Sequence, residues 1–217
     1  MRHTGGGDRR NEPRFERKES SLEFDRVAFF SDAVYAIAMT LLVVGIGVPH
    51  VRDANLGRAL SDLDSSIISF FIGFFVLGYY WVSHHALFAG LKAVNTPLLV
   101  VNLVYLAVVA FLPFPTAIVG TNGDAPLAFV LFASSLAAVS ILEVVLYMCA
   151  VRYDLLRDRP DEMQRRHDVI AGLIPAVFLL GSIPIAFGST RAAFFAWFLM
   201  FPAEAVLDRV IPDPRKR

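Results

Sequence analysis

Four ionisable side chains interrupt long apolar stretches of this sequence and are its first candidates for chemistry: Asp32, His84, His85 and Glu143. Polar groups inside a membrane span are costly, so each of them needs a physical reason. Asp32 could pair near the membrane interface or could bind or gate an ion, and residue type alone leaves both open. Adjacent histidines project about 100° apart on a helix, so only one can face a helix bundle, where it could pair with Asp32. For Glu143, a structural hydrogen bond to a neighbouring helix is a better interpretation than a role as a proton carrier.

No pattern of an enzyme or a metal site accompanies these residues. The two histidines have no HxxxH spacing, and Cys149 is the single cysteine, so no internal disulfide and no Cys/His metal pattern is possible. The sequence has no GxSxG motif and no nucleotide-binding loop. Its formal net charge of zero gives no basic signal for nucleic acid. We therefore expect no enzyme activity, no cofactor and no nucleic-acid partner.

The composition is that of a membrane protein. Hydrophobic residues make up 56% of the 217 residues and charged residues 18%, whereas soluble domains have about 45–50% and about 25%. The apolar residues lie in six runs, each close to the ~20 residues that a membrane helix needs. These runs predict an all-α integral membrane protein with spans at 27–49, 67–91, 97–120, 125–151, 169–188 and 192 to about 210.

Basic residues set the orientation of these spans. Seventeen of the 20 lysines and arginines lie in the two termini and in the loops after the second and fourth spans. Because basic loops stay in the cytoplasm, both termini are expected there. Residues 1–21 form a predicted disordered cytoplasmic tail, residues 22–210 the transmembrane domain, and residues 211–217 a cytoplasmic C-terminal tail.

The first span carries an apolar stripe. Ile37, Leu41 and Val44 lie at i, i+4 and i+7, so they share one face of a helix, and Thr40 borders that face. Asp32 lies about 140° away from Ile37 around the helix. Such a stripe usually faces lipid or packs against another helix. Arranged symmetrically around an axis, it would instead form a hydrophobic constriction that gates by dewetting.

One motif in the first span carries a resemblance to a known family. Residues 26–32 read RVAFFSD, the pattern RxxxFSD, and are followed by AVYAIAMTLLVVGIGVP. This segment resembles the first helix of the TMEM175 family of lysosomal and prokaryotic potassium channels. Residues 80–85, YWVSHH, also resemble the aromatic–histidine stretch in the second helix of that family. The resemblance extends over residues 22–210, the length of a prokaryotic member with one six-helix unit.

The resemblance implies a pore without a TVGYG filter, lined by the first helices of four chains. By position, Ile37 is then the bottleneck residue, Leu41 and Val44 are further apolar layers, and Thr40 is a polar layer. Val44 stands where a bulkier leucine is common in the family, which implies a wider layer. The motif residues are expected to form a network behind the pore helix with one of the two histidines: Arg26, Phe30, Ser31, Asp32, His84 and His85.

The resemblance implies a homotetrameric, passive potassium leak channel of the bacterial plasma membrane, in contact with lipids and without a cofactor. K⁺ is the permeant ion, with modest discrimination against sodium. The alternative is a proton- or ion-coupled secondary transporter in which Asp32 and Glu143 carry the ion. A structural membrane protein without transport is a third possibility.

Overall fold

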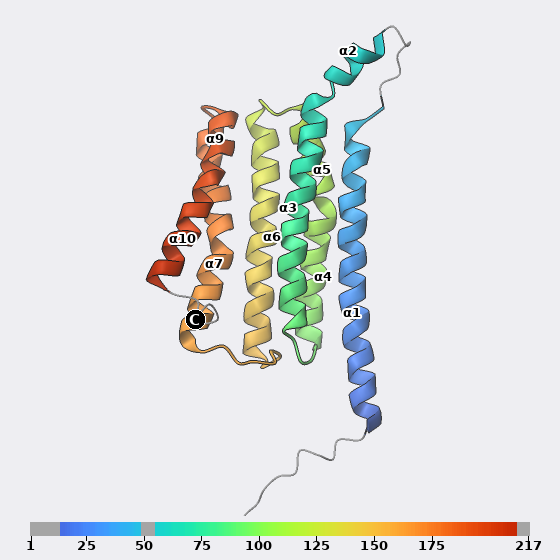
Figure 1. The fold of residues 1–217 in the computed structure, drawn as a ribbon, viewed down its shortest axis with the longest axis vertical. Helices are drawn as coiled ribbons and strands as arrows, with labels where there is room; N and C mark the ends of the chain where they lie inside the picture. Colours follow the sequence, from blue (N-terminus) through green and yellow to red (C-terminus); the bar gives the residue numbers. More distant parts are fainter. Residues whose placement is uncertain (1–13, 49–54, 212–217) are drawn as a thin grey trace, which may run out of the picture.

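The computed structural model describes residues 14–48 and 55–211, which form helices joined by short connections (Figure 1). The order along the chain is α1 (Arg14–Leu41), the 3₁₀ helix η1 (Leu42–Ile46), α2 (Leu56–Ser61), α3 (Asp64–Ala89), α4 (Thr96–Phe111), α5 (Pro113–Thr121), α6 (Pro126–Arg152), α7 (Glu162–Gly181), α8 (Ile183–Ala186), α9 (Thr190–Ala196), the 3₁₀ helix η3 (Trp197–Leu199) and α10 (Met200–Val210).

Six stretches of these helices are long and apolar enough to cross a membrane, which confirms the predicted number of spans. Several are built from consecutive helices, such as α4 with α5. In chain order the stretches are Phe24–Ile46, Asp64–Ala89, Thr96–Thr121, Pro126–Arg152, Glu162–Ala186 and Thr190–Val210.

The boundary of the N-terminal tail differs from the prediction. Helix α1 begins at Arg14, so residues 14–21 are helical rather than part of a disordered tail. This segment is rich in Glu, Arg and Lys, which are good helix formers, and it follows Pro13, a residue favoured at the start of a helix. Residues 1–13 and 212–217, where the rest of the two predicted tails falls, lie outside the described residues.

Proline residues break two of the spans. Helix α4 gives way to α5 at Leu112, just before Pro113, and the Thr116 hydroxyl donates to the Leu112 carbonyl at 2.8 Å. The second break is at Ser182, whose hydroxyl donates to the Leu179 carbonyl at 2.8 Å. Hydroxyl groups thus add hydrogen bonds to backbone carbonyls where the regular helix is interrupted, in a region where no water is available to supply them.

The spans are arranged around α6. In Figure 1, α1 lies at one edge of the bundle, α7, α9 and α10 lie at the opposite edge, and α6 stands between them. Helix α1 packs against α3 and α4, while α6 packs against α4, α5 and α7. Consequently α6 is the most buried span, and one broad face of α1 is left uncovered by the rest of the protomer.

Two connections at the same end of the bundle are joined to each other. Leu91, after α3, and Leu156, after α6, form an isolated antiparallel bridge. The Lys92 amide donates to the Leu155 carbonyl at 2.8 Å, and the Arg157 amide donates to the Gly90 carbonyl at 2.9 Å. The Lys92 ammonium also pairs with Asp154 at 2.9 Å and lowers the pKa of that carboxyl.

Two glycines permit a close approach of three helices. A Cβ added at Gly45 of η1 would lie 2.7 Å from the Cβ of Ala117 in α5. One added at Gly73 of α3 would lie 2.8 Å from Thr116 Cγ2 and 3.2 Å from Leu42 Cδ2. Small residues therefore bring η1, α3 and α5 together, as is typical of helix contacts in membranes.

We predict that Gly73→Ala lowers the free energy of unfolding by about 1–3 kcal/mol, because its methyl group overpacks this contact. Gly78→Ala in the same helix is the matched control, since its Cβ would meet only Met39 Cε at 3.7 Å. That substitution should be neutral or stabilising by up to about 1 kcal/mol through helix propensity. Thermal unfolding of the purified variants in detergent measures both, and equal midpoints would contradict the tight contact.

Candidate pore helix and the polar network behind it

The two faces of α1 have opposite surroundings. Ser31, Tyr35, Ala38 and Leu42 follow one another at helical spacing and are buried against the bundle. The predicted stripe lies on the other face: Ile37 is 59% exposed, Leu41 47% and Val44 73%, with Thr40 exposed beside them. The structure therefore places the sequence-predicted pore residues on the part of α1 that this protomer leaves uncovered.

The local backbone keeps these residues on one side. Leu41 is the last residue of α1, and Val44 lies in η1, where three residues make one turn. Val44 is three residues after Leu41, so the two side chains stay in line along the helix. The Thr40 hydroxyl donates to the Ile37 carbonyl at 2.8 Å, which leaves the oxygen lone pairs of Thr40 available on the exposed face.

A chain of hydrogen bonds supports the buried face. The Ser31 hydroxyl donates to the Val27 carbonyl at 3.0 Å and accepts from Asn102 Nδ2 at 3.0 Å. Asn102 Oδ1 lies 2.9 Å from His84 Nε2, and because an amide oxygen only accepts, that nitrogen carries the proton. Ser31, Asn102 and His84 are at most 2% exposed. The chain links α1, α4 and α3.

Aromatic rings enclose this chain of hydrogen bonds. The His84 ring stacks between Phe88, with centroids 4.3 Å apart, and Tyr105, with centroids 5.2 Å apart. The hydroxyl of Tyr105 is hydrogen-bonded to that of Tyr35 on α1. The buried polar groups are thus shielded from lipid by rings that themselves link α1 to α4.

As the spacing of the two adjacent histidines predicts, one faces the bundle and the other faces outward. Asp32, however, is bonded to a tryptophan and not to a histidine. His84 faces inward and binds Asn102, while His85 is exposed and its ring lies 5.5 Å from that of Trp81. The indole nitrogen of Trp81 donates to Asp32 Oδ1 at 2.9 Å. The side chain of Asp32, the residue after Ser31 on α1, is thus directed to α3. The expected pairing of Asp32 with the inward histidine is therefore wrong.

The remaining motif residues lie at the surface of the protomer. Arg26 and Phe30 are exposed on α1, outside the hydrogen bonds that join Ser31, Asn102 and His84. Sequence reasoning missed Asn102, Tyr35 and Tyr105. A signal for Asn102 was present, because it is the one carboxamide in the otherwise apolar run 97–120.

Glu143 belongs to a different part of the molecule. It lines a pocket between α3, α6, α7 and α10, and Asp32 is absent from the described residues that line this pocket. Two carboxylates in separate environments do not form one ion-coupling site. The structure therefore does not bring together the residues that the transporter alternative requires.

We predict that Asn102→Ala lowers the free energy of unfolding by about 1–3 kcal/mol, because His84 Nε2 and Ser31 Oγ each lose a buried partner. Asn122→Ala, at an exposed position after α5, is the control and should change it by less than about 0.5 kcal/mol. Thermal unfolding in detergent gives the comparison. Similar losses in the two variants would show that Asn102 has no special structural role.

A family model fits the part of the chain that contains α1 and the polar network behind it. The model described as endosomal/lysosomal potassium channel TMEM175 matches residues 26–113. This range includes Ser31, His84 and Asn102 as well as the stripe from Ile37 to Val44.

Relatives extend the similarity over most of the chain. A protein named as a potassium channel from Chamaesiphon minutus is 30% identical over 175 residues, covering 75% of this chain and 86% of the relative. One from Streptomyces collinus, also named as a potassium channel, is 42% identical over 96 residues, which are 44% of this chain and 47% of the relative. The alignment thus spans less than half of the Streptomyces protein.

A solved structure agrees with the fold. The crystal structure of a lysosomal potassium-selective channel TMEM175 homolog from Chamaesiphon minutus superposes with a TM-score of 0.70 at 26% sequence identity. The match covers 85% of this chain and 97% of that one. The fold of this chain therefore agrees with that of the solved structure over the matched part.

Proposed function

Because this chain belongs to the TMEM175 family, we propose that it is a passive, potassium-conducting cation channel whose pore is lined by α1 of four copies. The observation that carries the proposal is the exposed stripe of Ile37, Leu41 and Val44, opposite the face that the polar network holds in the bundle. A fourfold arrangement would cover this stripe with its own copies around a central axis.

The constriction would act through its apolar side chains. A ring of Ile37 offers no ligand that could replace the hydration shell of an ion, so water and ions enter it reluctantly and conduction is low. Thr40, one turn further along, supplies an oxygen whose proton is already given to the Ile37 carbonyl. That oxygen is an acceptor for a partly dehydrated cation, which is how Thr40 would contribute to potassium preference.

The polar network behind α1 would determine the shape of the pore without touching the ion. Ser31 is hydrogen-bonded to Asn102, which is itself bonded to His84, and Asp32 is bonded to Trp81, so α1 is prevented from rotating about its own axis. A rotation of one residue, about 100°, would replace Ile37 at the constriction by a neighbour. Arg26, Phe30 and His85, exposed in the protomer, are available for contacts between copies.

We place the channel in a bacterial plasma membrane with both termini in the cytoplasm. Support comes from the basic residues, since the connections after α3 and α6 and both termini hold seventeen of the 20 lysines and arginines. The exposed apolar side chains of α3, α7 and α10 would contact lipid or neighbouring copies.

We predict that Ile37→Asn raises potassium flux and reduces the preference for potassium over sodium, because a polar ring wets the constriction. Ile37→Phe should reduce flux, and Leu41→Asn should act like Ile37→Asn but more weakly. Liposomes containing equal amounts of folded tetramer, loaded with potassium or sodium, provide the measurement.

Ile141→Asn is the control for these variants, because it places the same side chain on an exposed position of α6, away from α1. It should cost about 1–3 kcal/mol of insertion energy without a change in ion preference. Unchanged flux and preference in both Ile37 variants would remove α1 from the pore.

The proposed orientation predicts the labelling of single cysteines in a Cys149→Ser background. A cysteine at 56–62 should react with a membrane-impermeant maleimide added to intact cells. A cysteine at 155–163 should react only after permeabilisation. Labelling of 155–163 in intact cells would reverse the proposed topology.

A further inference from the structure

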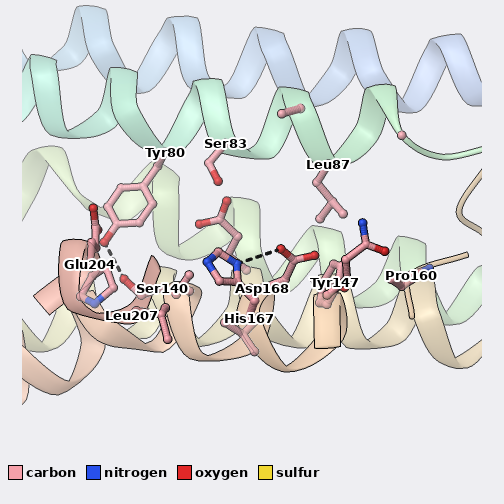
Figure 2. A pocket seen from close by; sticks show the side chains of 18 of the residues that line it. Tyr80, Ser83, Leu87, Ser140, Tyr147, Pro160, His167, Asp168, Glu204 and Leu207 are labelled. Carbon is pink, nitrogen blue, oxygen red and sulfur yellow. Dashed lines mark hydrogen bonds and ion pairs between the residues drawn. The ribbon is translucent and has the colours of Figure 1, made fainter. Parts of the chain in front are cut away.

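A pocket of about 580 Å³ lies within the protomer, between α3, α6, α7 and α10. Figure 2 shows its lining, with Tyr80 and Ser83 of α3 on one side and His167 and Asp168 of α7 on the other. Its volume is in the range of small-molecule sites, about 300–1,000 Å³. No residue of α1 is among the described residues that line it, so the pocket is separate from the proposed pore.

The charges that line the pocket have one sign. Five carboxyl groups contribute to it, and the described lining contains neither lysine nor arginine. The five are Glu143, Asp158, Asp168, Glu204 and Asp208. Three tyrosines complete the polar wall, and the faces of their rings attract cations. Such a cavity favours a positively charged occupant.

Two buried polar atoms in the lining have no hydrogen-bond partner among the described residues: Glu143 Oε1 and His167 Nδ1. His167 is 7% exposed, and its Nε2 lies 3.0 Å from Asp208 Oδ1. A carboxylate only accepts, so Nε2 donates to Asp208. Nδ1 lies 3.6 Å from Asp168 Oδ1, so carboxylates face both nitrogens of the ring. A buried carboxylate oxygen without a donor is unfavourable, and a ligand with N–H groups would satisfy Glu143 Oε1.

The spacing of these groups selects the kind of cation. A metal ion needs several ligands that converge on one point, and the described residues contain no group of three or more His, Cys, Asp or Glu that could hold one. The acidic side chains are instead distributed over α6, α7, α10 and the connection before α7. Apolar side chains such as Leu87 and Leu207 also line the pocket. A lining that combines separate carboxyl groups with apolar side chains suits a chain of methylene groups that carries ammonium groups.

We propose that this pocket is a binding site for an aliphatic di- or polyamine. One ammonium group lies against Glu143 Oε1 and Ser83, and another lies against Asp168. The methylene groups lie against the tyrosine rings and leucines. Gly90, Leu156 and Pro160 belong to the end of the pocket that the proposed topology places in the cytoplasm, so the amine would come from there.

The test is calorimetric titration of the full-length protein, purified in a neutral detergent, with spermidine as the probe. Saturable binding with a stoichiometry of about one per protomer is expected. Glu143→Gln should weaken binding about tenfold or more, because a charge-assisted hydrogen bond is lost. Glu204→Gln, at an exposed position, should weaken it about threefold or more, and this variant tests the proposal even if Glu143→Gln fails to fold.

Glu162→Gln is the matched control. Glu162 is an exposed carboxylate at the start of α7 that pairs with Arg165 and Arg166 and does not line the pocket. Its loss should leave spermidine affinity unchanged. Absence of saturable binding, equal weakening by Glu162→Gln, or displacement of spermidine by an equal concentration of Mg²⁺ would each overturn the proposal. Because binding is measured without ion flux, its failure is distinct from a failure of the channel assignment.

Discussion

Hydrocarbon offers no partner to a polar group, and this constraint determines how α1 is held. Ser31, Asn102 and His84 would each be unfavourable alone in a span, but together they satisfy one another across α1, α4 and α3. A rotation of α1 by one residue would break this chain of hydrogen bonds and turn Ser31 toward lipid. The direction of Ile37, Leu41 and Val44 follows from it, because these residues lie on the opposite side of the same helix. The rings of Tyr35 and Tyr105 reinforce the same orientation.

The six spans and the exposed stripe can be predicted from the sequence because both depend on local order: the length of an apolar run and the period of one helix. The pairing of polar groups depends on how neighbouring helices are rotated against each other, which no local pattern records. Hence the sequence does not reveal that Asp32 pairs with Trp81 rather than with a histidine, or that Asn102 joins Ser31 to His84. The start of α1 at Arg14 escapes prediction for another reason, since Glu, Arg and Lys are common in disordered tails and also favour helices.

The ionisable groups inside the bundle are divided between two environments. Those near α1, His84 and Asp32, are hydrogen-bonded to Asn102 and Trp81 and packed by aromatic rings, which suits a rigid support. Those between α6, α7 and α10 surround an open volume and include a buried carboxylate oxygen without a donor, Glu143 Oε1, which suits an exchangeable occupant. Glu143 and Asp32, similar in sequence as single acids in apolar runs, thus have unrelated roles.

The bridge between Leu91 and Leu156 affects how the two sides of the bundle can move. Its hydrogen bonds join backbone atoms, and a shift of about 1 Å is enough to lose them. The connection after α3 and the connection after α6 therefore form a pivot that holds their helices together at this end of the bundle. Any relative motion of these helices is largest at the other end. Since these bonds join backbone atoms, they do not depend on the identity of most side chains in the two loops, although Lys92 and Arg157 add side-chain bonds across the same contact. An inserted or deleted residue in either loop would shift the register of the two segments and break these backbone hydrogen bonds.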